Sequence, residues 1–535
     1  MSDSTNTIKK SAKRFFSGTL LSRISGMLRD MSMAYVFGAE ASVASFLLAF
    51  RLAHLMRRLF GEGAIQSAFV PEFEALRLTN EKKAHGFFCS LTLCISLIVL
   101  TSILFFGMVL GAILQWGNVS SANHEVIYLT ILMLPSLLFI CLYGLNASLL
   151  QCQHYFFVSS VAPVAFNVIW IITVMGLKNL SSQEAMPYLA IGVIFACFFQ
   201  WIWTVPTTFR FIKKSGVSSI IKESSAHFQN LLQLIKPLTL GILGVAASQI
   251  NNLVDSLFGR YAELEGPAIL WYSIRLQQLP LALFGIAISG AILPPLARAV
   301  KSGNYERYYY FLSYGLLATL GFMLPITGMI FCMGDTGVNL IYGRGDFNDS
   351  AIHQTTMCLW AYGIGLVPSA LILILAPAYY AKSNYKLPAL ISFLTMIVNL
   401  FLNSIFIFVF KWGIFSVAMA TSLSAWVNLA ILYSKINEQI LNKKSLFFIF
   451  KIILATFIAT FSVILVRNLM GNTWFIHNSS LNWPKNASSQ FFNLIYQLIT
   501  FILVWVTNIF FLRLSFNEIF LLKFSLNDRN KLINN

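Results

Sequence analysis

Long apolar runs recur along almost the whole chain and are separated by short polar or charged breaks. Most runs have about 20 residues or more, the length that an α-helix needs to cross the hydrocarbon core of a bilayer. The pattern predicts fourteen membrane-spanning helices, at about 15–37, 43–71, 86–115, 124–150, 156–177, 187–210, 232–258, 267–293, 308–332, 351–381, 387–410, 413–434, 446–466 and 490–522. We therefore expect an all-α polytopic membrane protein.

The composition excludes a soluble globular protein. Hydrophobic residues make up 57% of the chain and charged residues only 11%, whereas an ordinary soluble protein has about 25% charged residues. The seven cysteines form no C-x-x-C pair and nearly all lie in or beside apolar runs. They are interpreted as small hydrophobic residues and not as disulfides or metal ligands.

The basic residues follow the predicted topology. The net charge of +17 could indicate a nucleic-acid partner, but 25 of the 37 Lys and Arg residues fall on the side of the two termini and only 6 on the other side. The positive-inside rule then places both termini in the cytoplasm. Topology and contact with anionic lipid headgroups explain this charge, so membrane lipid is an expected partner and nucleic acid is not.

Six arginines remain inside predicted helices: Arg23, Arg29, Arg51, Arg57, Arg58 and Arg275. An arginine at the bilayer centre costs about 2.5 to 3.5 kcal/mol on insertion scales. Pairing with Asp30 and Glu62, the only acids in the same three helices, would neutralise part of this charge, and Arg57 or Arg58 could also reach the interface. The surplus predicts a solvated cationic cavity, and guanidinium forks favour a phosphate or diphosphate carried on a lipid.

The chain also contains an internal repeat. A shift of 224 residues superposes 49–71 on 273–295 without a gap, and Arg51 then meets Arg275. Parallel repeats of this kind in transporters are related by an axis along the membrane normal, with the substrate site near their interface. We expect two six-helix lobes with pseudo-two-fold symmetry, followed by two additional C-terminal helices.

Five stretches carry a recognisable pattern: SRISGMLRDMSMAYVFGA (22–39), AFRLAHLMRRLFGEGAIQSAFVPEF (49–73), YSIRLQQLPLALFGIAISGAILPPL (272–296), IYGRGDF (341–347) and AYYAKSNYKLP (378–388). In order and spacing they resemble the MurJ/MviN family of bacterial lipid II flippases, within the MOP superfamily. The resemblance runs from about residue 8 to residue 440. It implies an inner-membrane transporter, not an enzyme, that moves undecaprenyl-diphosphate-linked peptidoglycan precursor from the inner to the outer leaflet by alternating access.

The resemblance also implies a domain plan and a site. The domain ranges are a cytoplasmic segment 1–14, an N-lobe 15–212, a cytoplasmic linker 213–231, a C-lobe 232–440, a lipid-tail groove 441–523 and a cytoplasmic tail 524–535. The implied diphosphate cavity contains Arg23, Arg29, Asp30, Arg57 and Arg275, with Arg58 and Glu62 in the following motif, and the repeat adds Arg51. Lipid II is the expected partner, and other cell-wall synthesis proteins are candidate partners.

No cofactor is expected apart from a candidate monovalent cation, sodium. Asp255 is an acid at membrane depth, and oxygens of Asn399, Asn403, Val417 and Thr421 are available on neighbouring helices. Some members of the resembled family bind sodium at the corresponding helices. Hydrogen bonding between helices explains these side chains equally well.

Two other functions compete with the flippase. Another MOP-superfamily exporter, such as a polyprenyl-linked polysaccharide flippase or a drug/cation antiporter, would share the fold, although drug exporters favour acids in the cavity. A membrane enzyme of polyprenyl phosphate metabolism would need a set such as H-E-x-x-H or paired aspartates for magnesium on a cytoplasmic loop, and the sequence has neither.

Overall fold

The structure is a computed structural model and describes residues 5–56, 64–214, 235–436, 440–441, 443–470 and 486–512. Every regular element in these ranges is helical. Nine of the described helices are long and apolar enough to cross a membrane, and two bent helix pairs raise this number to 11. The predicted all-α polytopic class is confirmed, and the chain is a multi-pass membrane protein. The count of fourteen helices stays a prediction.

The chain divides into two compact units. Unit 1 comprises Met1–Arg260, Leu264–Ala268 and Gly345–Phe347, and unit 2 comprises Tyr261–Glu263, Ile269–Arg344 and Asn348–Asn535. Unit 1 therefore includes almost all of α11 (Ile235–Ala262), a helix that the sequence assigns to the second lobe. The predicted domain limits, including the linker at 213–231, stay a prediction.

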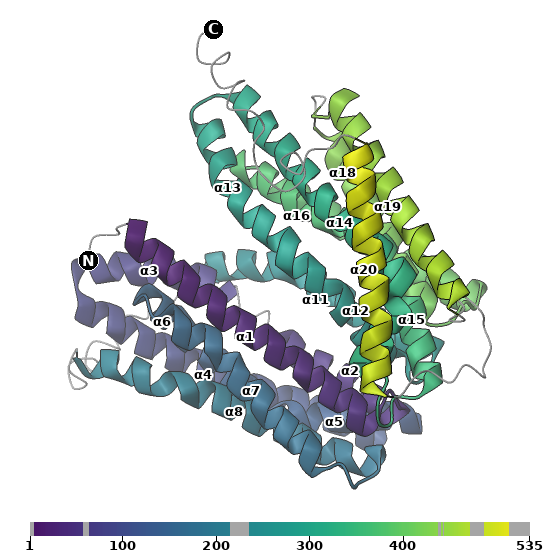
Figure 1. The fold of residues 1–535 in the computed structure, drawn as a ribbon. Coiled ribbons are helices and arrows are strands. Elements are labelled where there is room, and N and C mark those ends of the chain that lie inside the picture. The colour runs from purple at the N-terminus through teal and green to yellow at the C-terminus, as the bar shows by residue number, and fades with distance from the viewer. Residues whose placement is uncertain are drawn as a thin grey trace. The chain divides into compact units, whose positions relative to one another are not determined.

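Unit 1 is built around long helices that pack along one another (Figure 1). Besides α11 they are α1 (Thr5–Phe37), α2 (Ala41–Met56), α3 (Ala64–Thr79), α4 (Glu81–Trp116), α5 (Ser121–Met133), α6 (Ser136–Cys152), α7 (Phe156–Gly176) and α8 (Ser182–Lys214). Helix α7 packs against both α1 and α8. At the interface of α1, α2 and α7 the indole of Trp170 is buried, and the rings of Phe46, Phe50 and Phe166 contact it.

Unit 2 surrounds the 38-residue helix α14 (Tyr305–Tyr342). Its other elements are α12 (Gly266–Pro280), a π-helical turn η3 (Leu281–Gly285), α13 (Ile286–Lys301), α15 (Asp349–Ile364), α16 (Leu366–Ala381), α17 (Lys386–Ser404), a second π-helical turn η4 (Ile405–Val409), α18 (Phe415–Ser434), α19 (Lys443–Leu469) and α20 (Ala487–Phe511). Helix α14 contacts α13, α15, α16, α19 and α20. The last two helices thus pack on the central helix of this unit.

One span in unit 2 is broken inside the apolar region. Helices α15 and α16 meet at Gly365 with a bend of 42°. The break frees carbonyl groups in the last turn of α15, and unpaired backbone groups are costly in lipid. Side chains of Gln277, Ser422 and Trp426 donate to three of these carbonyls at 3.0, 2.6 and 3.0 Å. Neighbouring helices α12 and α18 therefore supply the hydrogen bonds that the bend removes.

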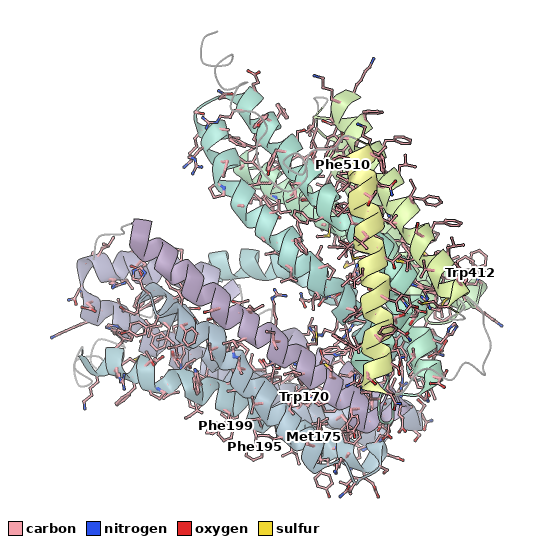
Figure 2. All side chains as sticks on the ribbon, viewed as in Figure 1. Trp170, Met175, Phe195, Phe199, Trp412 and Phe510 are labelled. Carbon is pink, nitrogen blue, oxygen red and sulfur yellow. The ribbon has the colours of Figure 1, made fainter. Side chains whose placement is uncertain are left out.

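Large apolar side chains cover the outer surface of both units. Figure 2 labels Phe195 and Phe199 on α8 and Phe510 on α20, which are 56%, 44% and 77% exposed. Exposed rings of this size would be unfavourable in water but suit contact with lipid.

Candidate functional site

Arg29 and Asp30 form a buried ion pair on α1. The guanidinium Nε and Nη2 of Arg29 both donate to Oδ1 of Asp30, at 3.1 and 2.8 Å. The two residues are 7% and 5% exposed. Two of the three predicted residues on this helix are therefore in direct contact, and their charges neutralise each other locally.

Neutral groups of α7 complete the surroundings of Arg29. Nη1 donates to the side-chain oxygen of Asn167 at 3.3 Å, and the guanidinium carbon lies 5.0 Å from the ring centre of Trp170. The amide of Asn167 in turn donates to the hydroxyl of Ser25 on α1 at 2.9 Å. These contacts fix the orientation of the guanidinium and stabilise its charge through the ring faces.

Arg23 differs from Arg29 in its surroundings. It lies six residues earlier on α1, about 9 Å along the axis. Its side chain is exposed on unit 1, and the apolar side chains of Ile24 and Leu28 are about half exposed beside it, at 50% and 51%. Arg23 is therefore an accessible cation on this helix.

Arg51 connects two helices within unit 1. From α2 it donates to the backbone oxygen of Asn252 on α11 at 3.0 Å and to the hydroxyl of Ser256. A second arginine makes the reverse connection, since Arg260 on α11 donates to Ser45 on α2 at 3.0 Å. Arg51 thus has protein acceptors in place, and its predicted role as a substrate ligand stays a prediction.

Arg275 stacks on an aromatic ring in unit 2. It is half-buried on α12, and its guanidinium carbon lies 4.4 Å from the ring centre of Trp271, one turn earlier. The same helix is fixed to α15 by Ser273, whose hydroxyl donates to a backbone oxygen at 3.0 Å. The π-helical turn η3 follows directly after Pro280. The predicted residues Arg57, Arg58 and Glu62 lie outside the described residues.

The candidate cation ligands fall into both units. In unit 1, Asp255 is 4% exposed and accepts a hydrogen bond from Asn251 at 3.3 Å. In unit 2, Asn399 and Asn403 are fully buried on α17, and the Thr421 hydroxyl on α18 donates to the Val417 carbonyl at 3.0 Å. The side-chain oxygens of Asn399 and Asn403 are buried, whereas Thr421 is half-buried, and the cation site stays a prediction.

An ion pair in unit 2 was missed in the sequence. The predicted spans 308–332 and 446–466 end before Asp335 and Arg467 and leave both residues in loops, which is wrong for both. Each lies inside a helix, α14 and α19 respectively, and they are 7% and 3% exposed. The predicted spans ended too early because a charged residue lowers the mean hydropathy of its own helix. That average does not include a neutralising partner on another helix. Two opposite charges just after the C-terminal ends of two predicted helices were the available signal.

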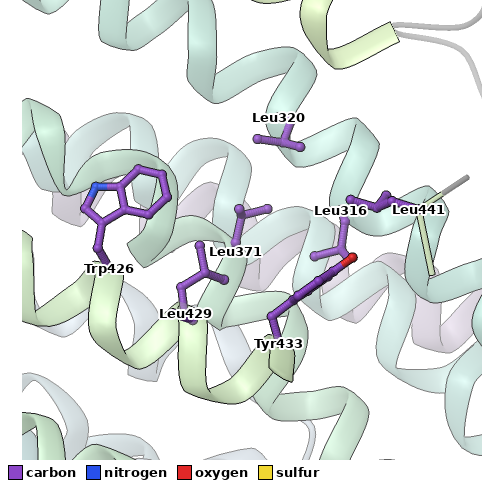
Figure 3. Close-up of a pocket in the computed structure, with 8 residues that line it drawn as sticks. Leu316, Leu320, Leu371, Trp426, Leu429, Tyr433 and Leu441 are labelled. Carbon is purple, nitrogen blue, oxygen red and sulfur yellow. The ribbon is translucent and has the colours of Figure 1, made fainter. Parts of the chain in front are cut away.

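A pocket in unit 2 is apolar throughout. Figure 3 shows it between α14, α16 and α18, with a volume of about 280 Å³ and with Leu316, Leu371, Trp426 and Tyr433 in its wall. None of its lining residues carries a charge. It therefore fits a hydrocarbon chain and not a phosphate group.

Solved structures support the helical arrangement. A lipid II flippase MurJ in an inward closed conformation matches with a TM-score of 0.74 and 24% identity, over 93% of this chain and 98% of that chain. An inward-facing multidrug resistance MATE family transporter of the MOP superfamily matches with a TM-score of 0.63 and 12% identity, over 79% of this chain and 96% of that chain. Both likenesses concern the fold.

Sequence comparison gives the family. The profile described as "Lipid II flippase MurJ" matches residues 33–484. A Chlamydia muridarum protein named "Probable lipid II flippase MurJ" is 35% identical over 434 residues, which are 81% of this chain and 79% of that protein. A protein of the same name from Vibrio cholerae is 31% identical over 477 residues, or 85% of this chain and 88% of that protein. With such coverage, the chain belongs to the lipid II flippase MurJ family.

Proposed function

We propose that this protein carries lipid II from the inner to the outer leaflet of the bacterial inner membrane by alternating access. Family membership over residues 33–484 carries the proposal and makes the chain a transporter and not an enzyme. The arginines supply the chemistry, because a guanidinium binds a phosphate group through two parallel hydrogen bonds. Arg29 lies inside α1 in unit 1, and Arg275 lies inside α12 in unit 2.

Arg29 has a partner that substrate can replace. Asp30 is the next residue on the same helix, so the guanidinium can exchange the carboxylate for a diphosphate without any separation of helices. The exchange also avoids a bare buried cation when no substrate is present, which would be strongly unfavourable. Asp30 is thus proposed to hold Arg29 in the substrate-free state and to release it to the diphosphate.

Release of the substrate requires that the contacts differ between states. A charge-assisted hydrogen bond is worth about 1.5 to 3 kcal/mol, so several arginines that held the diphosphate in every conformation would retain it. Arg29 belongs to unit 1 and Arg275 to unit 2. A change in the position of one unit against the other would alter how many arginines reach one diphosphate.

Both termini are proposed to lie in the cytoplasm, and the basic residues support this. Of 37 Lys and Arg residues, 25 fall in segments on the side of the termini. A fluorescent protein fused after Asn535 should fold and fluoresce, whereas alkaline phosphatase at the same position should stay inactive. Active phosphatase there would overturn the orientation.

Sodium is proposed as a coupling ion at the oxygens of α17 and α18. Its test is the sodium dependence of transport in the parent and in Asn403→Ala, with Ser434→Ala on the exposed end of α18 as the control. Transport that is equally fast in sodium-free buffer would remove the proposal.

Reconstitution tests the function directly. Purified protein in vesicles should translocate lipid II, and it should leave a cationic drug and a polyprenyl-linked polysaccharide unit behind. Arg29→Ala and Arg275→Ala should abolish translocation and growth of a flippase-depleted bacterium, while Arg298→Ala, at an exposed arginine of α13, should retain both. Full activity of Arg29→Ala and Arg275→Ala would show that these arginines are structural. Transport of the drug or the polysaccharide unit in preference to lipid II would favour another MOP exporter.

A further inference from the structure

The outer end of α14 buries an unusual set of polar side chains against α19 and α20. The set comprises Asp335, Thr336 and Asn339 on α14, Arg467 on α19, and Gln490 and Gln497 on α20, all between 0% and 7% exposed. Polar and ionisable groups are rare in membrane helices because lipid offers them no partners. The concentration of six such side chains at one end of one helix interface therefore indicates a specific role for them.

A bidentate ion pair forms the centre of this set. Arg467 donates from Nη1 to Oδ1 of Asp335 at 2.9 Å and from Nη2 to Oδ2 at 2.6 Å. Nη1 also donates to the backbone oxygen of Cys332 at 2.8 Å, and the backbone N–H of Thr336 donates to Oδ1 of Asp335 at 2.7 Å. Two parallel N–H···O bonds between the guanidinium and the carboxylate make this a bidentate ion pair, whose geometry is more specific than that of a single contact.

Helix α20 joins the same set through its glutamines. The Gln490 amide donates to the Asn339 side chain at 3.2 Å, and its oxygen accepts from Nε and Nη2 of Arg344, both at 3.2 Å. One turn of α14 away, the Thr336 hydroxyl donates to Gln497 at 3.2 Å. Both C-terminal helices are thus hydrogen-bonded to the last turns of α14.

The rest of this interface is apolar and closely packed. Ala455, Ala459 and Phe501 belong to one buried cluster with Cys332. Gly328 lets the helices approach, since a Cβ there would lie 2.6 Å from the Thr456 methyl group. In a bilayer this packing acts without a hydrophobic driving force, and hydrogen bonds between the helices add to it. Hydrogen bonds have no substitute in lipid.

We propose that Asp335, Arg467 and Gln490 form an anchor that keeps α19 and α20 attached to α14, so that these three helices move as one body. Lys451 on α19 donates to the Leu512 carbonyl after α20 at 2.7 Å and joins the two C-terminal helices at their opposite end. The anchor prevents lipid from separating the pair from unit 2 during conformational change. It acts in this way whichever lipid the protein transports.

The test measures the distance between α14 and α19 in the full chain in nanodiscs. Spin labels are attached through an unnatural ketone amino acid at Tyr310 on α14 and Leu465 on α19, which are 46% and 51% exposed, so the native cysteines stay in place. Pulsed electron–electron double resonance should give one narrow distribution of the distance between the two labels in the parent protein. The same narrow distribution is expected for Asp349→Asn, the matched control at an exposed aspartate.

The anchor predicts that Asp335→Asn loses the single narrow distribution and gains longer distances. The double variant Asp335→Leu with Arg467→Met keeps the test valid if Asp335→Asn fails to fold, because apolar replacement of a buried ion pair often preserves stability. It should fold and still lose the narrow distribution, since the hydrogen bonds that join α14 to α19 are removed while the apolar packing stays. A parent-like distribution in either folded variant would overturn the anchor.

Discussion

Unit 1 and unit 2 each bury an arginine–aspartate pair, and the two pairs are built differently. Arg29 and Asp30 are neighbours on one helix, and a single carboxylate oxygen accepts both hydrogen bonds. Asp335 and Arg467 come from two helices and use both carboxylate oxygens. The first pair lies within one helix and joins no two helices, whereas the second joins α14 to α19. The comparison teaches that pairing alone does not show whether a membrane arginine is structural or available to substrate.

The largest effect is expected where the pair joins helices. Asp335→Asn leaves Arg467 buried without its counter-charge, and breaking a buried pair in this way costs about 3 to 5 kcal/mol. The midpoint of thermal unfolding in nanodiscs should fall strongly, and that of Asp349→Asn should match the parent. An Asp335→Asn variant as stable as the control would remove the distinction between the two pairs.

The next effect concerns the exchangeable pair. Arg29→Ala removes one charge-assisted contact to the diphosphate, and its affinity for lipid II should fall roughly 10- to 100-fold. Titration of detergent-solubilised protein with lipid II measures this, and Arg298→Ala serves as the control. Unchanged affinity would mean that Arg29 never leaves Asp30.

A smaller loss of stability is expected when only the charge of Asp30 is removed. In Asp30→Asn the guanidinium of Arg29 keeps Asn167 and the ring of Trp170 as partners. The free energy of unfolding should fall by about 1 to 2 kcal/mol, less than for Asp335→Asn in the same thermal assay. A loss of stability in Asp30→Asn equal to or larger than that in Asp335→Asn would show that both ion pairs serve to stabilise the fold.

The smallest effect sharpens the comparison with an arginine that stacks on a ring. Trp271→Leu removes the ring against which Arg275 stacks, an interaction worth about 0.5 to 1 kcal/mol where the cation is not fully desolvated. Lipid II affinity should therefore change by a few fold only, because Arg275 keeps its charge and its place on α12. A complete loss of binding in Trp271→Leu would show that the ring fixes the guanidinium for substrate.

Hydropathy predicted the helices because apolar runs of membrane length are a strong and local signal. It missed the bend at Gly365, where polar side chains from α12 and α18 replace backbone hydrogen bonds. It also ended two spans before Asp335 and Arg467. A charged residue marks the end of a predicted span when hydropathy is averaged along one helix. The contact between α14 and α19, which neutralises both charges, does not enter that average.

The sequence named candidate site residues, which stay a prediction, but it did not indicate the partners that the structure gives them. Counting carboxylates left most arginines without a neutralising group. In the structure Arg29 also uses Asn167 and Trp170, and Arg51 uses a backbone oxygen and a hydroxyl on α11. Neutral acceptors and ring faces stabilise a guanidinium as well, and no sequence pattern marks them in advance.

One measurement tests the central claim that the two pairs serve different purposes. The lipid II dissociation constant of the folded fraction is measured for Arg29→Lys and Arg467→Lys, two identical exchanges that keep the charge and remove the fork. We expect a dissociation constant raised roughly tenfold or more for Arg29→Lys and a smaller change for folded Arg467→Lys, which lies in the predicted lipid-tail groove and not in the predicted diphosphate cavity, and whose thermal midpoint should fall instead. Equal dissociation constants for both variants would contradict the account.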